Sequence, residues 1–141
     1  MISEIFKITD DSEVSLTSYI SDISEEMKNM KTKSAILVLP GGAYKFCSDR
    51  EAEPVALAYL AKGFNAFVLR YSLNEKAAFP TPLNDAQKAL AFIRKNAEKF
   101  HTDPQKIAVI GFSAGGHLAA ALSTMSEDKP DACILGYPCI L

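Results

Sequence analysis

The pentapeptide Gly-Phe-Ser-Ala-Gly at residues 111–115 is the pattern in this chain with the clearest chemical meaning. It follows the apolar run 106–110 and precedes the helix-like run 117–122. A strand, a G-x-S-x-G turn and a helix together form the arrangement that exposes a nucleophilic serine. The turn is expected to hold Ser113 in a strained backbone conformation, and its glycines admit the close approach of neighbouring backbone. Ser113 is therefore the predicted nucleophile.

A serine hydroxyl is a poor nucleophile without a base, and the oxyanion formed by its attack needs hydrogen-bond donors. The backbone amide of Ala114 follows the serine, at the positive end of the next helix. A second glycine-rich turn, Pro-Gly-Gly-Ala-Tyr at residues 40–44, also follows an apolar run and is the natural source of further donors. We predict an oxyanion hole made by the backbone amides of Gly41, Gly42 and Ala114.

Two histidines are present as candidates for the base. His101 precedes the strand that leads to the serine, so we expect it at the opposite, amino end of the sheet. His117 lies one helical turn after Ser113 and is predicted to point into the fold or between helices. We interpret both histidines as structural residues. With only these two histidines in the chain, we expect no metal site, and no cofactor motif is present.

Three tyrosines follow predicted strands at their carboxyl ends and are candidates to line an acyl or sugar pocket: Tyr44, Tyr71 and Tyr137. Ordinary packing is the alternative for each of them. Cys47 lies near the 40–44 turn and is interpreted as a packed thiol. Asp85 lies near a helix start, where a carboxylate is favoured by the helix dipole, and receives no catalytic role.

Four apolar runs predict buried strands, at residues 35–39, 64–71, 106–110 and 132–137. Ser48 with Glu51 predicts a capping box that starts a helix, and Gly63 is expected to end it. A second helix is predicted from Thr81 as N-cap, with an apolar stripe that continues to Phe100. The third helix follows the serine. Residues 102–104 are predicted to form a turn.

Because strands alternate with helices, we predict an α/β fold with a mostly parallel sheet and helices on both of its faces. Alternating residues near the N-terminus predict a β-hairpin around the acidic turn 10–13, which adds antiparallel strands at one edge. Ligands of such sheets bind at the carboxyl ends of the strands, where both glycine-rich turns lie. The length suits one domain, residues 1–141.

The order of these motifs resembles one branch of the α/β-hydrolase superfamily, the acetylesterase and feruloyl-esterase-like carboxylesterases. The resemblance covers nearly all of residues 33–141, through LPGGAY, SDREAEPVALAYLAKGFNAFVLRYS, FPTPLNDAQKALAFIRKNAEKFHTDPQKIAVIGFSAGGHLAA and ACILGYP. It implies hydrolysis of small carboxylic esters, often acyl groups on sugars or xylan. It also implies that Ser113 is the nucleophile and that Gly41, Gly42 and Ala114 form the oxyanion hole. Pro40 replaces the histidine of the related HGGG loops, and Ala43 replaces their third glycine.

In this superfamily an acid and then a histidine follow the serine along the chain, after a strand equivalent to residues 132–137. Residues up to 141 offer no matching position. We therefore expect an N-terminal part of a longer hydrolase, with the sheet stopping before the last strands and with weak activity or none alone. We also expect the edge strand 132–137 to pair with a second copy. Two alternatives remain: an inactive half-hydrolase that acts as a binding or assembly module, and an amide or formamide hydrolase.

Composition excludes several other classes. The net charge of −2 gives no electrostatic argument for nucleic acid or for an anionic membrane. No apolar stretch approaches the roughly 20 residues that cross a bilayer, and no signal-peptide pattern is visible. The three cysteines are odd in number and lack CxxC spacing, so we expect reduced, mostly packed thiols and a cytoplasmic protein. The expected partner is a small ester.

Overall fold

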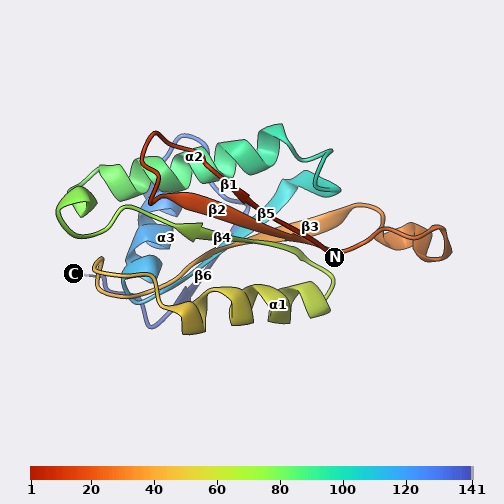
Figure 1. Ribbon diagram of the computed structural model, residues 1–141, viewed down its shortest axis with the longest axis horizontal. Helices are drawn as coiled ribbons and strands as arrows, with labels where there is room; N and C mark the ends of the chain where they lie inside the picture. The colour runs from red at the N-terminus through yellow and green to blue at the C-terminus, as the bar shows by residue number, and fades with distance from the viewer. Residues whose placement is uncertain (141) are drawn as a thin grey trace.

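One mixed β-sheet forms the centre of the computed structural model, which describes residues 1–140 (Figure 1). Its strands lie in the order β1-β2-β4-β3-β5-β6. Their bounds are β1 Ile2–Phe6, β2 Ser15–Ile20, β3 Lys33–Leu39, β4 Asn65–Arg70, β5 Thr102–Phe112 and β6 Ala132–Gly136. Strand β3 pairs in parallel with β4 and β5, and β5 with β6, whereas β2 is antiparallel to both β1 and β4. The predicted parallel centre with an antiparallel hairpin at one edge is confirmed.

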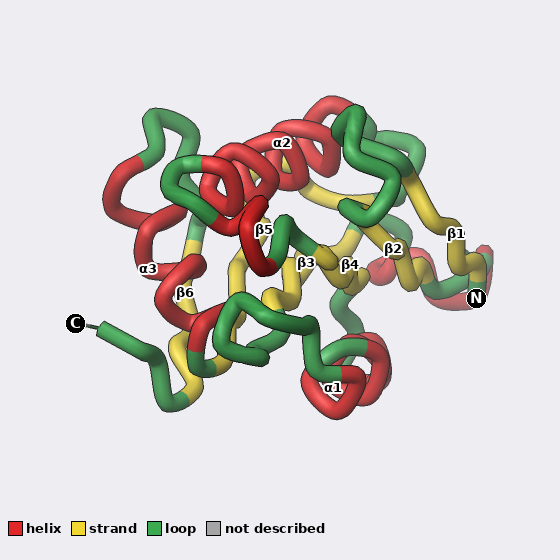
Figure 2. The backbone as a smooth tube through the Cα atoms, turned by 60° about the vertical axis from the view of Figure 1, so that its left-hand side comes forward, coloured by secondary structure: helices red, strands yellow, loops and turns green. Residues whose placement is uncertain are grey.

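Helices cover both faces of this sheet, as Figures 1 and 2 show. The α-helices are α1 Glu53–Ala61, α2 Thr81–Lys95 and α3 Ala114–Met125, and three 3₁₀ helices lie at Glu25–Met30, Asp49–Glu51 and Asn74–Ala77. Helix α1 lies on one face, and α2 and α3 lie on the other. This layering confirms the predicted α/β class.

The core is divided between the two faces of the sheet. Leu37 of β3 points into the larger cluster, under α2 and α3, and its neighbour Ile36 points into the smaller cluster, under α1. Successive side chains of a strand point to opposite faces, so a strand covered on both sides must be apolar throughout. That requirement explains the uninterrupted apolar run of β3.

The N-terminal hairpin is confirmed, with Phe6 of β1 opposite Leu16 of β2. Its acidic connection is ordered by Asp11, whose carboxylate accepts the Glu13 amide at 2.9 Å and pairs with Lys76 at 3.2 Å. These contacts, the Glu13 amide first, hold the pKa of Asp11 below its ordinary value.

The predicted capping box at Ser48 and Glu51 is wrong. Helix α1 begins two residues after Glu51, and the Ser48 side chain caps neither it nor the preceding 3₁₀ turn. The physical reason is that the Glu51 carboxylate accepts a hydrogen bond from the distant Gly41 amide instead of from Ser48. Gly63 does end the helix, with a φ of 92° that suits glycine.

Two further boundaries differ from prediction. Helix α2 has Pro80 rather than Thr81 at its N-cap, and it ends at Lys95, so Phe100 is buried from the turn beyond the helix. Strand β5 begins at Thr102, not after the predicted turn, because Thr102 pairs with Lys33. The predicted turn appears as a register shift inside the strand, where the Gln105 amide donates to the Asp103 carboxylate.

Strand β6 is at the edge of the sheet beside β5, as predicted, and its side chains Ile134 and Leu135 are exposed. In the described residues, the longest helix is too short and too polar to cross a bilayer.

Candidate active site

Ser113 sits in the turn between β5 and α3, with φ 53° and ψ −116°. A non-glycine residue in this left-handed region is strained, and such strain is frequent at functional sites. A Cβ added to Gly111 would lie 2.1 Å from the Gly115 carbonyl oxygen, and a Cβ on Gly115 would lie 2.1 Å from that of Leu39. The predicted need for glycine on both sides of the serine is therefore confirmed.

Backbone hydrogen bonds fix the Ser113 peptide against the end of β6. The Ser113 amide donates to the Gly136 carbonyl at 3.0 Å. The Ser113 carbonyl accepts from the amides of His117 at 2.9 Å and Cys139 at 3.1 Å. These three bonds give the strained turn its support, because surrounding structure must hold such a conformation in place.

The 40–44 loop follows β3, which neighbours β5, so it lies beside the serine turn. Its conformation is left-handed at Ala43, with φ 58°, and at Tyr44, with φ 59°. The Lys45 amide closes the turn by donating to the Gly42 carbonyl at 2.9 Å. Ala43 thus takes up, with strain, a backbone conformation that glycine would adopt freely.

The backbone of Pro40 and Gly41 is held by side chains and amides from other segments. The Tyr71 hydroxyl donates to the Pro40 carbonyl, and the Ser48 amide donates to the Gly41 carbonyl at 2.8 Å. The Gly41 amide itself donates to Glu51 Oε1 at 3.0 Å. Gly41 as an oxyanion donor is therefore a prediction to correct, because its N–H is already bound.

The other two predicted donors, the amides of Gly42 and Ala114, make no hydrogen bond within residues 1–140. Gly42 lines an open cleft of about 450 Å³ together with Gly41, Arg50, Glu51, Ser113 and Tyr137, and Ala114 directly follows the cleft residue Ser113. Ser113 and the loop that would stabilise its oxyanion thus share one cavity. This volume lies within the range of small-molecule sites.

The three predicted tyrosines lie in different places. Tyr137 lines the cleft with Ser113 and donates its hydroxyl to Glu51 Oε2. Tyr44 lies beside a separate cavity of about 100 Å³ and shares a 2.8 Å hydrogen bond with His117 Nδ1. Burial, with a contribution from Cys139, raises the pKa of Tyr44 to about 12.

Tyr71 does not line the cleft, and of its two interpretations ordinary packing agrees with the structure. It is buried, and its hydroxyl supports the Pro40 carbonyl. Burial, above all, raises the pKa of this phenol, which keeps it a neutral donor. Its position after β4 was predicted correctly, but the side chain turns into the larger core cluster.

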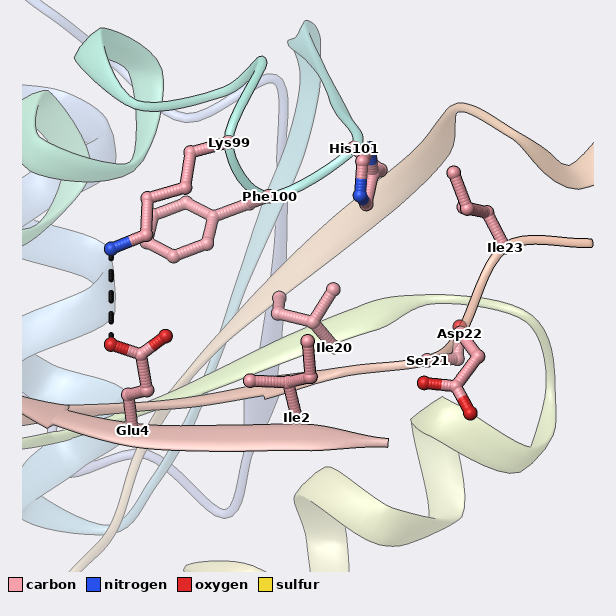
Figure 3. Close-up of a pocket in the computed structure, with 9 residues that line it drawn as sticks. All are labelled: Ile2, Glu4, Ile20, Ser21, Asp22, Ile23, Lys99, Phe100 and His101. Carbon is pink, nitrogen blue, oxygen red and sulfur yellow. Dashed lines mark ion pairs between the residues drawn. The ribbon is translucent and has the colours of Figure 1, made fainter.

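Neither histidine is hydrogen-bonded to the serine hydroxyl, which has no hydrogen-bond partner within the described residues. His117 is exposed, which corrects the prediction that it points into the fold, because its ring turns outward to Tyr44. His101 directly precedes β5, at the far end of the sheet as predicted. There it lines a hollow of about 610 Å³ with Lys99, Glu4 and Ile20 (Figure 3).

The thiols are not uniformly packed. Cys47 is half-buried against the core, and burial raises its pKa, in agreement with a packed thiol. Cys133 and Cys139 are exposed, contrary to expectation, because β6 is an open edge and Cys139 follows it. Among residues 1–140, no group of three histidine, cysteine, aspartate or glutamate side chains is placed to hold a metal ion.

Glu51 is the site residue that the sequence reasoning missed. Its carboxylate lies in the cleft and joins Gly41 to Tyr137. The sequence does carry a signal, an acidic residue in a short polar segment soon after the glycine turn. Ser48 stands three residues before it, however, and this spacing is typical of a capping box at a helix start.

The family profile described as BD-FAE matches residues 21–134. The chain belongs to the BD-FAE family. The crystal structure of MGS-M1, an α/β-hydrolase enzyme from a Medee basin deep-sea metagenome library, is 55% identical with a TM-score of 0.99. The BD-FAE chain is covered completely in that comparison, and it spans 58% of the MGS-M1 chain. Its fold is therefore the α/β-hydrolase fold.

Curated relatives of this BD-FAE chain include two proteins with xylan in their names. Endo-1,4-beta-xylanase B of Butyrivibrio fibrisolvens is 37% identical over 77% of this chain, which spans 20% of that relative. Acetylxylan esterase of Xylanibacter ruminicola is 36% identical over 75% of this chain, which spans 22% of that protein. The chain thus corresponds to about a fifth of each of these two relatives.

Proposed function

We propose that this BD-FAE chain supplies the nucleophile and the oxyanion donors of a carboxylic ester hydrolase. The observation that carries the proposal is the approach of the serine turn to the start of the 40–44 loop, where a Cβ placed on Gly115 would lie 2.6 Å from the Pro40 carbonyl oxygen. Ser113 and Gly42 line one cleft, and the amides of Gly42 and of Ala114, the residue after Ser113, have no hydrogen-bond partner within residues 1–140. A nucleophile beside unengaged donors is what acyl transfer requires.

In the proposed reaction, Ser113 Oγ attacks the acyl carbonyl carbon and the carbonyl oxygen becomes an oxyanion. The amides of Gly42 and Ala114 donate to that oxygen, and losing one such donor typically costs about 3 kcal/mol in the barrier. The alcohol leaves, and water then releases the acid from the acyl-serine. Within residues 1–140 the hydroxyl of Ser113 bonds to no base, so we propose that a histidine and an acid from a longer chain complete the site.

For the substrate we propose a small acyl ester, with acetylated carbohydrate as the leading class. The names of the two xylan-related relatives support this choice. The modest volume of the open cleft and its polar rim, which includes Arg50 and Glu51, also favour a short acyl group on a polar alcohol.

The free cysteines Cys47, Cys133 and Cys139 support the proposed cytoplasmic setting.

Hydrolysis of para-nitrophenyl acetate tests this function, measured on the longer protein that carries the proposed histidine and acid. Ser113→Ala is expected to remove the turnover above background, whereas Ser123→Ala is the matched control. Ser123 lies in the same helix, and its hydroxyl donates to the Ala119 carbonyl, away from the cleft. Equal turnover by the wild type and Ser113→Ala would refute the proposal. If para-nitroacetanilide is cleaved in a Ser113-dependent way and faster than para-nitrophenyl acetate, an amide hydrolase is favoured. If neither substrate shows Ser113-dependent turnover, a binding module is favoured.

A further inference from the structure

The side chain of Glu51 connects two loops on either side of the serine. Its Oε1 accepts the Gly41 amide at 3.0 Å, and its Oε2 accepts the Tyr137 hydroxyl. Gly41 follows β3 and Tyr137 follows β6, and these strands flank β5, which leads to Ser113. One carboxylate therefore ties together the two walls of the cleft.

This carboxylate lies next to the nucleophile. A Cβ placed on Gly41 would lie 2.9 Å from Glu51 Oε1 and 3.1 Å from Ser113 Cβ. Both groups thus border the same small space, and both line the same cleft. A shift of the Glu51 side chain would therefore change the surroundings of Ser113 as well as the start of the helix that follows Glu51.

A helix-capping role does not account for this side chain. Helix α1 begins at Glu53 with Ala52 at its N-cap, and no side-chain hydrogen bond caps it. Both carboxylate oxygens of Glu51 are instead engaged by cleft residues. A hydrogen bond to a charged acceptor is stronger than a neutral one, so the Gly41 peptide is held firmly.

The hydrogen bonds made by Gly41 bear on which backbone amides of the 40–44 loop remain free to bind an oxyanion. The Gly41 carbonyl is bound by the Ser48 amide and the Gly41 N–H by Glu51, so this residue is fixed on both sides. The next amide along the loop, that of Gly42, has no partner within residues 1–140. Its φ of 145° and the 2.0 Å approach of the Phe46 carbonyl to a Cβ placed there leave room only for glycine.

We propose that Glu51 is a positioning residue for the oxyanion hole. By binding the Gly41 amide it removes that group from the donor set and sets the orientation of the Gly42 amide, which then serves the oxyanion. Through Tyr137 it also couples this loop to the end of β6, where the Ser113 amide is held by Gly136. This inference rests on the proposed ester hydrolysis.

The first test needs no activity and uses amide hydrogen exchange of Gly41, measured by NMR on the 141-residue chain. Glu51→Ala is expected to speed exchange at Gly41 by about tenfold or more, because the bond that protects it is lost. Glu51→Gln is expected to stay within about threefold of the wild type, because its amide oxygen can still accept from Gly41 and its amide nitrogen can donate to Tyr137. Glu53→Ala, an exposed acid in the first turn of α1, is the matched control and should change nothing at Gly41.

Unchanged Gly41 exchange in Glu51→Ala would overturn the inference. If Glu51→Ala fails to fold, Tyr137→Phe tests the second contact, since it frees one carboxylate oxygen and leaves the Gly41 bond in place. Tyr137→Phe should accelerate amide exchange at Gly41 by more than the Glu53→Ala control does. The acceleration should be smaller than the tenfold expected for Glu51→Ala. Exchange indistinguishable from that control would count against the coupling of the two loops.

The second test is the kinetics of para-nitrophenyl acetate hydrolysis by the longer protein that carries the proposed histidine and acid. Glu51→Ala should lower kcat by about tenfold or more with KM within about twofold, since a misplaced donor acts on the transition state. Glu51→Gln should restore kcat to within about threefold of the wild type, which a purely steric role of the side chain would not require. Wild-type turnover with an unchanged kcat in Glu51→Ala would refute the positioning role. Absence of any wild-type turnover would instead refute the proposed function, and the exchange result would still decide the role of Glu51.

Discussion

Replacing Gly115 by alanine tests the close approach on which the candidate site depends. Gly115 is the second residue of α3, where helix propensity alone would favour alanine by about 1 kcal/mol. A Cβ at this position would lie 2.1 Å from the Leu39 carbonyl oxygen and 2.6 Å from that of Pro40. Both neighbours are backbone atoms at the end of a central strand, so neither can rotate away.

Relief of this overlap requires α3 and β3 to separate by about 1 Å, and overpacking of this kind typically costs about 1–3 kcal/mol, occasionally more. With the clash on backbone rather than on side chains, we place the cost at the upper end. Gly115→Ala should therefore lower the free energy of unfolding by about 2–3 kcal/mol despite its better propensity. Helix propensity alone would raise the free energy of unfolding and the overlap would lower it, so the sign of the measured change separates the two effects.

The assay is urea unfolding followed by circular dichroism, with the midpoint shifted and the slope m unchanged. For a chain of this size, the expected loss corresponds to a fall of roughly 10 °C in Tm. Ala120→Gly in the same helix is the control, with a loss of about 1 kcal/mol from propensity alone. A Gly115→Ala protein that is as stable as the wild type, or more stable, would refute the close approach of these two segments.

Three further predictions concern the loop, the thiols and the edge. Ala43→Gly should raise the free energy of unfolding by about 0.5–1 kcal/mol, because it relieves a left-handed alanine, and an unchanged urea midpoint would argue against that strain. At pH 8, Ellman's reagent should modify the exposed Cys133 and Cys139 well before Cys47, whose pKa is raised by burial; peptide mapping that finds Cys47 modified first would contradict this burial. The open edge of β6 should pair with a second copy, giving a dimer mass by light scattering that Ile134→Lys reduces to a monomer, and a monomeric wild type would exclude this pairing.

Local patterns in the sequence were sufficient to predict the sheet and the serine turn. Apolar runs bounded by glycine or proline, such as the run before Pro40, identify strands covered on both faces. Alternation with helices then requires parallel neighbours, and the observed order β4-β3-β5-β6 agrees. The glycines around Ser113 could be interpreted correctly because their contacts lie within the turn or on the adjacent strand.

The errors arose where a side chain is used by a distant segment. Glu51 matches a capping box locally, yet its partner Gly41 is ten residues earlier in the chain. Tyr71 follows its strand as predicted, but nothing local says that it is buried with its hydroxyl on Pro40. His117 lies in the predicted helix, and its outward direction depends on Tyr44. Such contacts depend on how the loops at the carboxyl end of the sheet pack together.

The central claim is that Ser113 is the nucleophile of this site. The most direct measurement uses the longer protein that carries the proposed histidine and acid: mass spectrometry after incubation with a fluorophosphonate, followed by peptide mapping of the adduct. We expect one adduct, on Ser113, which is lost in Ser113→Ala and retained in Ser123→Ala. An adduct on another residue, or no adduct on Ser113, would contradict it.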